Sequence, residues 1–159
     1  MNGRSFHFER MIPAWLGVDD VGHIAIFYAH GEAPVPHSAA ASTANTLAVT
    51  RLLMEMSSSN IASIHRDDLP LDDFASIAQR GLYAFGWLDV YGMRETAPKA
   101  YELVASPLRP LRLDHLPPNI RHIAGATRLQ GLHFSRCHEA SGRAGIQSSI
   151  EDFLSSEFS

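Results

Sequence analysis

The stretch GLYAFGWLDVYG, residues 81–92, constrains the fold more than any other part of this chain. Successive side chains of a β-strand point to opposite faces, so Tyr83, Phe85 and Trp87 would share one face. The other face would carry side chains that are also small or apolar: Leu82, Ala84, Gly86 and Leu88. Because neither face is polar, the pattern predicts a buried strand near 82–88.

Two further patterns predict strands that accompany it. Residues 23–29, HIAIFYA, are rich in β-branched and aromatic side chains, and Gly31 followed by PVP at 34–36 would end that strand. Residues 100–105 are expected beside 82–88 in an antiparallel pair. Their expected alternation sets three residues against two: Tyr101, Leu103 and Ala105 against Glu102 and Val104.

Two shorter stretches are compatible with the same sheet. Residues 61–64 fit a short strand, and a last strand is predicted over 128–134. In that last strand Leu129 and Leu132 can share a face only if Gly131 marks a bulge.

The hydrophobic period changes to that of a helix after the first strand. Apolar residues recur there every three or four positions: Val49, Leu52, Leu53 and Met56. With the alanines before them they predict one helix near 41–56. A second, short helix is expected to start at Asp72, which can cap it, and to end before Gly81. We therefore predict an α+β fold, a mostly antiparallel sheet with one main helix and one short helix packed on it.

Length and composition fit one compact domain over 1–159 with a frayed tail from 148 to 159, since 45% of the 159 residues are apolar and 19% are charged. No apolar run reaches the roughly 20 residues of a membrane span. Glu9 and Arg10 interrupt the position where a secretion signal needs apolar residues. The single cysteine, Cys137, cannot form an internal disulfide, which is typical of a reducing compartment. We expect a cytoplasmic protein without a membrane segment.

Two clusters contain residue types that enzymes use. His30 stands at a predicted strand end close to Glu32, and an imidazole beside a carboxylate can act as a general base. Cys137 is followed by His138, and a histidine can activate a thiolate. Neither cluster supplies nucleophile, base and orienting group together. A small hydrolase or metal-dependent enzyme using one of these pairs is therefore the alternative reading.

The even spacing of His23, His30 and His37 raises the question of a metal site. An odd separation places His23 and His30 on opposite faces of a strand, so the three side chains would not converge on one ion. The region of Cys137 lacks a second thiol and a zinc-ligand spacing. Glycine-rich phosphate loops and a nucleophile elbow are also missing from the sequence. We expect neither a metal nor a cofactor.

Acidic residues gather in DDLPLDD, which holds Asp67, Asp68, Asp72 and Asp73, and the net charge is -4. A helix dipole would account for the second pair but not for the first. An acidic patch steers and selects a basic protein partner. The later arginines are too widely spaced to predict a nucleic-acid-binding face. We take these four aspartates, with His30 and Glu32, as candidate partner-binding residues.

Three stretches together resemble a known class of proteins: GHIAIFYAHGEAPVP, RGLYAFGWLDVYG and YELVASPLRPLRLDHLPP. They are similar to segments of small bacterial immunity proteins encoded beside polymorphic or contact-dependent toxins. The resemblance covers the middle half of the chain. It implies a non-enzymatic α+β protein that binds and neutralises a cognate toxin in the cytoplasm, with an acidic surface facing a basic toxin domain.

The sequence thus predicts a protein-binding module, an immunity-type inhibitor in the first place. The enzyme named above is one alternative. A structural or assembly subunit that associates through the face of Trp87 and Tyr91 is the other. Oligomeric state is left open.

Overall fold

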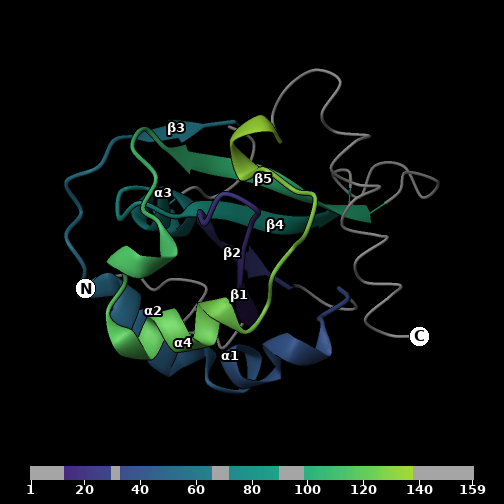
Figure 1. Ribbon diagram of the computed structural model, residues 1–159. Helices are drawn as coiled ribbons and strands as arrows, with labels where there is room; N and C mark the ends of the chain where they lie inside the picture. The colour runs from purple at the N-terminus through teal and green to yellow at the C-terminus, as the bar shows by residue number, and fades with distance from the viewer. Residues whose placement is uncertain (1–12, 30–32, 66–71, 90–98, 138–159) are drawn as a thin grey trace.

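The computed structural model describes residues 13–29, 33–65, 72–89 and 99–137. Within these residues five strands form one sheet in the order β1-β2-β4-β5-β3 (Figure 1). Their bounds are β1 (Ala14–Val18), β2 (Ile24–Tyr28), β3 (Ala62–Ile64), β4 (Tyr83–Asp89) and β5 (Lys99–Pro107). The pair β2 and β4 is parallel, and the other neighbouring pairs are antiparallel. The predicted α+β class with a mostly antiparallel sheet is confirmed.

In the described part of the chain four α-helices accompany the sheet: α1 (Ala40–Ala44), α2 (Thr46–Met54), α3 (Asp72–Ala78) and α4 (Pro118–Gly125). The predicted single helix near 41–56 is divided into α1 and α2 because Asn45, at φ -117° and ψ 35°, leaves the helical region. The short helix expected at Asp72 is α3, and Gly81 follows it with a φ of 100°. Among the described residues no helix has the length and apolar character that a membrane crossing needs.

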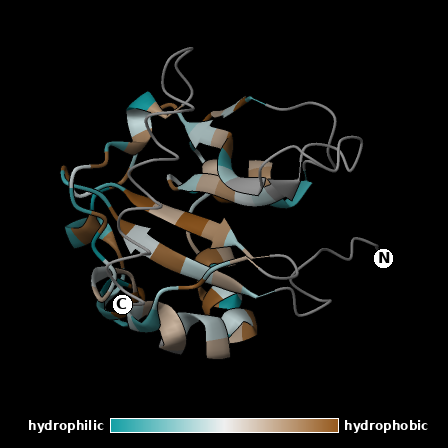
Figure 2. Cartoon of the chain, turned by 90° about the vertical axis from the view of Figure 1, so that its right-hand side faces the viewer, coloured by the Kyte–Doolittle hydropathy of each residue, from teal (hydrophilic) through white to brown (hydrophobic). Residues whose placement is uncertain are grey.

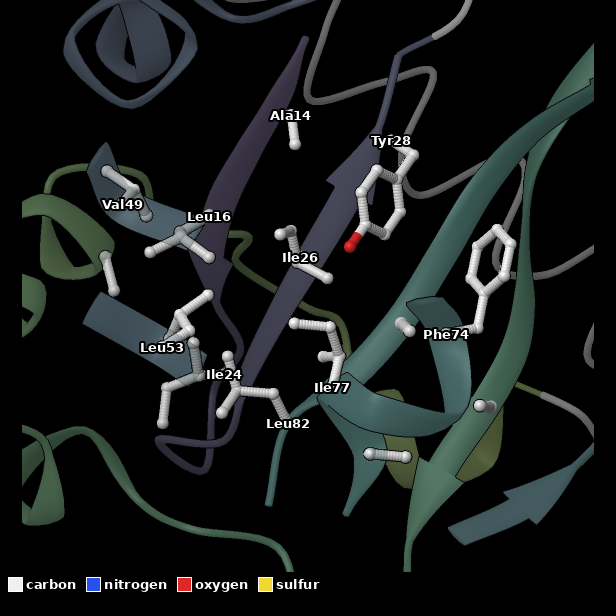
Figure 3. Close-up of a cluster of buried hydrophobic side chains, with 14 of the residues drawn as sticks. Ala14, Leu16, Ile24, Ile26, Tyr28, Val49, Leu53, Phe74, Ile77 and Leu82 are labelled. Carbon is white, nitrogen blue, oxygen red and sulfur yellow. The ribbon is translucent and has the colours of Figure 1, made fainter. Parts of the chain in front are cut away.

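One face of the sheet is covered by helices and forms what we call the helix-side core. Leu16, Ile24 and Ile26 from β1 and β2 point toward side chains of α2 and α3 (Figure 3). The helices contribute buried residues that are three or four positions apart: Val49 and Leu53 from α2, Phe74 and Ile77 from α3, Ile120 and Ala124 from α4. Burial of these apolar groups holds the helices on the sheet.

The opposite face carries a cluster that we call the aromatic core. Phe27 at its centre stacks between Trp15, at a centroid distance of 4.1 Å, and Phe85, at 4.7 Å. Tyr101 and Phe134 meet Phe27 edge-on at 5.3 and 6.0 Å. The strands at the centre of the fold are therefore apolar on both faces, and hydrophobic residues concentrate along them (Figure 2).

The strand predicted over 128–134 does not form. Arg128 makes an isolated parallel bridge to Val18, and the chain then turns at Gly131, whose φ is 80°, into a 3-10 helix at Phe134–Arg136. The turn brings Leu129, Leu132 and Phe134 into the aromatic core. The predicted bulge was therefore replaced by a left-handed turn that only glycine adopts without strain.

The alternation predicted for 100–105 holds for its first part and fails at a bulge. Tyr101 and Leu103 lie in the aromatic core as expected. The register shifts between Ala84 and Phe85, because Phe85 pairs with Leu103 whereas Ala84 pairs with Ala105. Val104 and Ala105 therefore both belong to the helix-side core.

Candidate functional site

The structure describes two aspartates of the predicted acidic patch, and these two differ in solvent exposure. Asp72, the first residue of α3, is exposed, but the next residue, Asp73, is 3% exposed. Burial, and to a lesser degree the charge of the nearby Asp73 carboxylate, raises the pKa of the interior Tyr28 phenol. Of this pair only Asp72 is exposed to solvent. Four other predicted residues lie outside the described residues: Asp67, Asp68, His30 and Glu32.

The Cys137 thiol is part of the aromatic core and is 8% exposed. Its Sγ donates to the backbone carbonyl of His133 at 3.4 Å, one turn earlier in the chain. His138 and Tyr91 lie outside the described residues. In the part of the chain that is described, no group of three or more His, Cys, Asp or Glu side chains could hold a metal ion.

A buried carboxylate that the sequence analysis did not single out, Asp19, lies in the turn between β1 and β2. Its Oδ1 accepts the backbone N–H groups of Val21 and His23 at 3.0 and 2.9 Å. Its Oδ2 accepts the N–H of Phe134 at 2.8 Å. The DDVG turn was the sequence signal, since Asp at a turn bonds the backbone that follows it. Two of these bonds close the turn and the third ties it to the Phe134–Arg136 segment, so Asp19 has a structural role.

His23 and a nearby hollow complete the polar features of this corner. Burial lowers the pKa of the His23 imidazole, and the charges of Arg112 and His133 lower it further against the opposing effect of Asp19. A shallow hollow of about 240 Å³ is lined by Gly22, Arg112, Leu113, Asp114 and Arg121. Among the described residues the lining of this hollow contains two arginines and one aspartate but no thiol, hydroxyl or imidazole.

Exposed apolar side chains gather at the edge of the sheet that β3 forms. Four large hydrophobic residues are exposed among the described ones, and three of them lie at β3 and its pairing partner: Ile61 (58%), Ile64 (39%) and Leu108 (58%). The Leu108 N–H donates to the Ile61 carbonyl at 2.8 Å, so these two residues face each other across the pair. We call the three residues the β3 edge surface. A cluster of this kind at a sheet edge is typical of an interaction site.

The backbone of β3 is open on its outer side. The Ile61 carbonyl and the His65 N–H bond β5 through Leu108 and Val104, each at 2.8 Å. In an antiparallel pair the groups facing the partner alternate along the strand. The N–H and C=O groups of Ala62 and Ile64 therefore point away from β5, and no strand among the described residues pairs with that side.

Side chains hold this open strand in place. Asn60 donates from Nδ2 to the Arg109 carbonyl at 2.6 Å and accepts the Arg109 N–H at 3.0 Å. His65 Nε2 and Ser106 Oγ lie 2.8 Å apart at the other end of β3. The start of β3 is thus held to the residues just after β5, and its other end is held to β5 itself. Because this backbone is already ordered, binding a partner here would cost little conformational entropy.

The sequence contained a partial signal for this surface. Ile61 and Ile64 are separated by an odd number, so in a strand they lie on opposite faces and one core cannot bury both. Nothing local to 61–64 indicates that the strand lies at an edge, because strand order depends on the whole sheet.

No protein family, curated protein or solved structure matches this chain, so its function has to be argued from its own residues.

Proposed function

We propose that this protein is a non-enzymatic protein-binding module, an immunity-type inhibitor that neutralises a cognate bacterial toxin in the cytoplasm. The observation that carries the proposal is the β3 edge surface, where Ile61 and Leu108 are each 58% exposed beside a strand edge that no strand of the described residues pairs with. Apolar side chains that lose water on association supply most of the binding free energy of such a surface. The chemistry expected of an enzyme finds less support, since Asp19 and Cys137 are occupied by backbone contacts.

The charge near this surface supports a basic partner. Asp72 is exposed at the start of α3, a helix that contacts β3, and in sequence Asp67 and Asp68 follow β3 within four residues. Acidic groups beside an apolar patch accelerate the encounter with a basic protein and select against acidic ones. The single cysteine, which cannot form an internal disulfide, agrees with the reducing cytoplasm.

The test uses the protein encoded by the adjacent gene as the candidate toxin. Its toxicity on expression should be suppressed by co-expression of the present chain, and the two purified proteins should bind. Lysine at both apolar positions, Ile61→Lys with Leu108→Lys, should weaken that binding by a factor of about 30 or more. Val21→Lys is the matched control, because Val21 is 36% exposed but lies in the turn between β1 and β2.

Three results would contradict the proposal. They are a neighbour that is harmless when expressed alone, toxicity that persists beside this chain, and a double lysine variant that binds as tightly as the Val21→Lys control. Asp72→Asn tests the charge separately: it should reduce the salt dependence of binding, because an exposed ion pair is screened by salt.

A further inference from the structure

The exposed apolar side chains of the β3 edge surface lie on both faces of the sheet. Ile64 pairs with Ala105, which belongs to the helix-side core, so Ile64 is on the helix-covered face. Ile61 is three residues earlier and therefore lies on the opposite face, across from Leu108. A partner that rests on one face of the sheet would cover one of these isoleucines and leave the other in water. A strand placed against the edge would contact both.

The backbone offers what such a strand requires. Ala62 and Ile64 direct two N–H and two C=O groups outward, enough for a ladder over three residues. Edge strands that avoid pairing usually carry charge or proline, and residues 61–64, IASI, carry neither. Since the strand is short, the backbone bonds would fix register while Ile61, Ile64 and Leu108 supply apolar contact.

We infer that the partner adds an extended segment to β3, with an apolar residue beside Ile61, another beside Ile64, and a Lys or Arg at the end nearest Asp72. This inference rests on the proposed function, because it specifies how the same surface is occupied. Two apolar residues three positions apart on the incoming strand lie on opposite faces, as Ile61 and Ile64 do. The recognition mode is strand addition, in which main-chain bonds give affinity and alternate side chains give specificity.

A second copy of this chain fits the edge less well. A two-fold axis joins β3 strands antiparallel, and the outward groups of Ala62 and Ile64 can then meet in three registers. In the two registers whose facing residues the structure describes, Ile61 lies across from Ser63 or His65 of the other copy, both of them polar. A partner of different sequence can place an apolar residue there instead.

The acidic end of the edge sets the position of the basic residue. The Asn60 N–H donates to the carbonyl of Gln79, just after α3, at 2.9 Å, so α3 ends near the start of β3. Phe74, in the first turn of α3, meets Tyr28 of β2 at 5.3 Å, and Tyr28 pairs with Gly86 of β4. Ala84, two residues before Gly86, shares the partner Ala105 with Ile64. Helix α3 therefore runs antiparallel to β3 and begins, at Asp72, toward the end that carries Ile64. The opposite end carries the exposed Arg109. A basic group near Asp72 is attracted, and one near Arg109 is repelled.

The experiment selects a phage-displayed library of random linear peptides on the full chain, with counter-selection on Ala62→Pro. Proline at 62 removes an outward N–H and leaves every bond to β5 in place. Ala62→Ser is the matched control, because it keeps that donor. Enriched peptides should share two apolar residues three positions apart with Lys or Arg beyond one of them, and should bind Ala62→Pro at least about tenfold more weakly than Ala62→Ser.

Amide hydrogen exchange on the unmodified chain gives a second readout that does not depend on how the proline variant folds. An enriched peptide should slow exchange at Ala62 and Ile64 by about tenfold or more and leave Ser63 and His65 unchanged, because the latter pair already faces β5. Peptides that lose binding to Ile61→Lys but protect neither outward amide would overturn strand addition and leave the proposed function standing. Peptides indifferent to Ile61→Lys and Ala62→Pro, or no enrichment, would overturn both. Self-association that Ala62→Pro abolishes would replace the foreign segment by a second copy and overturn the inference.

Discussion

The two edge strands of this sheet, β1 and β3, differ in whether the rest of the described chain bonds to their outer backbone groups. At β1 the Val18 N–H donates to Thr127 at 2.9 Å and the Val18 carbonyl accepts from Leu129 at 2.8 Å, while Thr46 Oγ1 accepts the Ala14 N–H at 3.1 Å. At β3 the outward groups of the strand meet no strand among the described residues, and apolar side chains stand exposed beside them. An edge closed by the chain itself serves stability, whereas an open one is available for binding. Substitutions should therefore affect folding at β1 and association at β3.

The largest effect on stability is expected at the anchor of the closed edge, Asp19. Asp19→Ala removes three hydrogen bonds and leaves the buried Phe134 N–H without its acceptor. We expect a loss of about 3 kcal/mol in the free energy of unfolding, measured by urea denaturation. Asp20→Ala is the control, because the exposed Asp20 accepts one bond, from the Gly131 N–H at 2.8 Å. Equal losses in the two variants would show that the Asp19 anchor is not special.

A smaller loss is expected where Thr46 closes β1. Thr46→Val keeps the shape of the side chain but leaves the buried Ala14 N–H unsatisfied, at a cost of about 1.5 kcal/mol. The matched variant Thr43→Val removes one bond to the Ala39 carbonyl within the adjoining helical turns, at 2.9 Å, and should change stability by less than about 0.5 kcal/mol. Thermal unfolding of the two variants measures this difference in stability. A Thr46→Val variant as stable as Thr43→Val would mean that this end of β1 needs no cover.

His23 should make the free energy of unfolding depend on pH. Its folded-state pKa is lowered from 6.5, chiefly by burial, so the unfolded chain takes up the proton first as the pH falls. Stability from this group is present above the unfolded pKa and is lost as the pH falls from 6.5 toward the folded value. Between about pH 7.5 and pH 5 the unfolding free energy of the natural chain should fall more than that of His23→Asn. Parallel pH profiles of the two proteins would contradict the assignment.

Substitutions on the open edge should leave folding almost unchanged. Ile61→Lys places a charge on a side chain that is already 58% exposed, so the unfolding free energy should change by less than about 0.5 kcal/mol. Ile77→Ala, in the helix-side core at 0% exposure, is the comparison and should cost about 3 kcal/mol. If Ile61→Lys destabilised the chain as Ile77→Ala does, Ile61 would be part of a core and not of a binding surface.

Local pattern was sufficient to predict the central strands. In β4 the side chains on both faces are apolar, and their alternation predicted a strand buried on both sides. The structure confirms this by placing Phe85 and Ala84 in different cores. Pattern failed where distant contacts decide. The predicted set of one main and one short helix omits α4, which begins at Pro118. Proline fits the first turn of a helix, whose N–H groups have no partner there, but it gives no signal of the sheet face on which that helix packs.

The candidate site could be predicted less well than the fold. Asp73 was grouped with its acidic neighbours because sequence alone does not say which face of a seven-residue helix turns inward, and α3 buries it. Exposure of Ile61 and Leu108 follows from the position of β3 at the end of the strand order. That order depends on all five strands together, so no window of sequence around residue 61 contains it.

The most direct test of the account compares amide hydrogen exchange at the two edges of the uncomplexed protein. The amides of Ala14 and Val18 should be protected nearly as well as those of the core strands, because each has a hydrogen-bond acceptor. The amides of Ala62 and Ile64 should exchange at close to the rate of unstructured chain, while that of His65, which bonds Val104, stays protected. Protection of Ala62 and Ile64 equal to that of Ala14 would mean that the β3 edge is closed, and the account of a binding edge would be wrong.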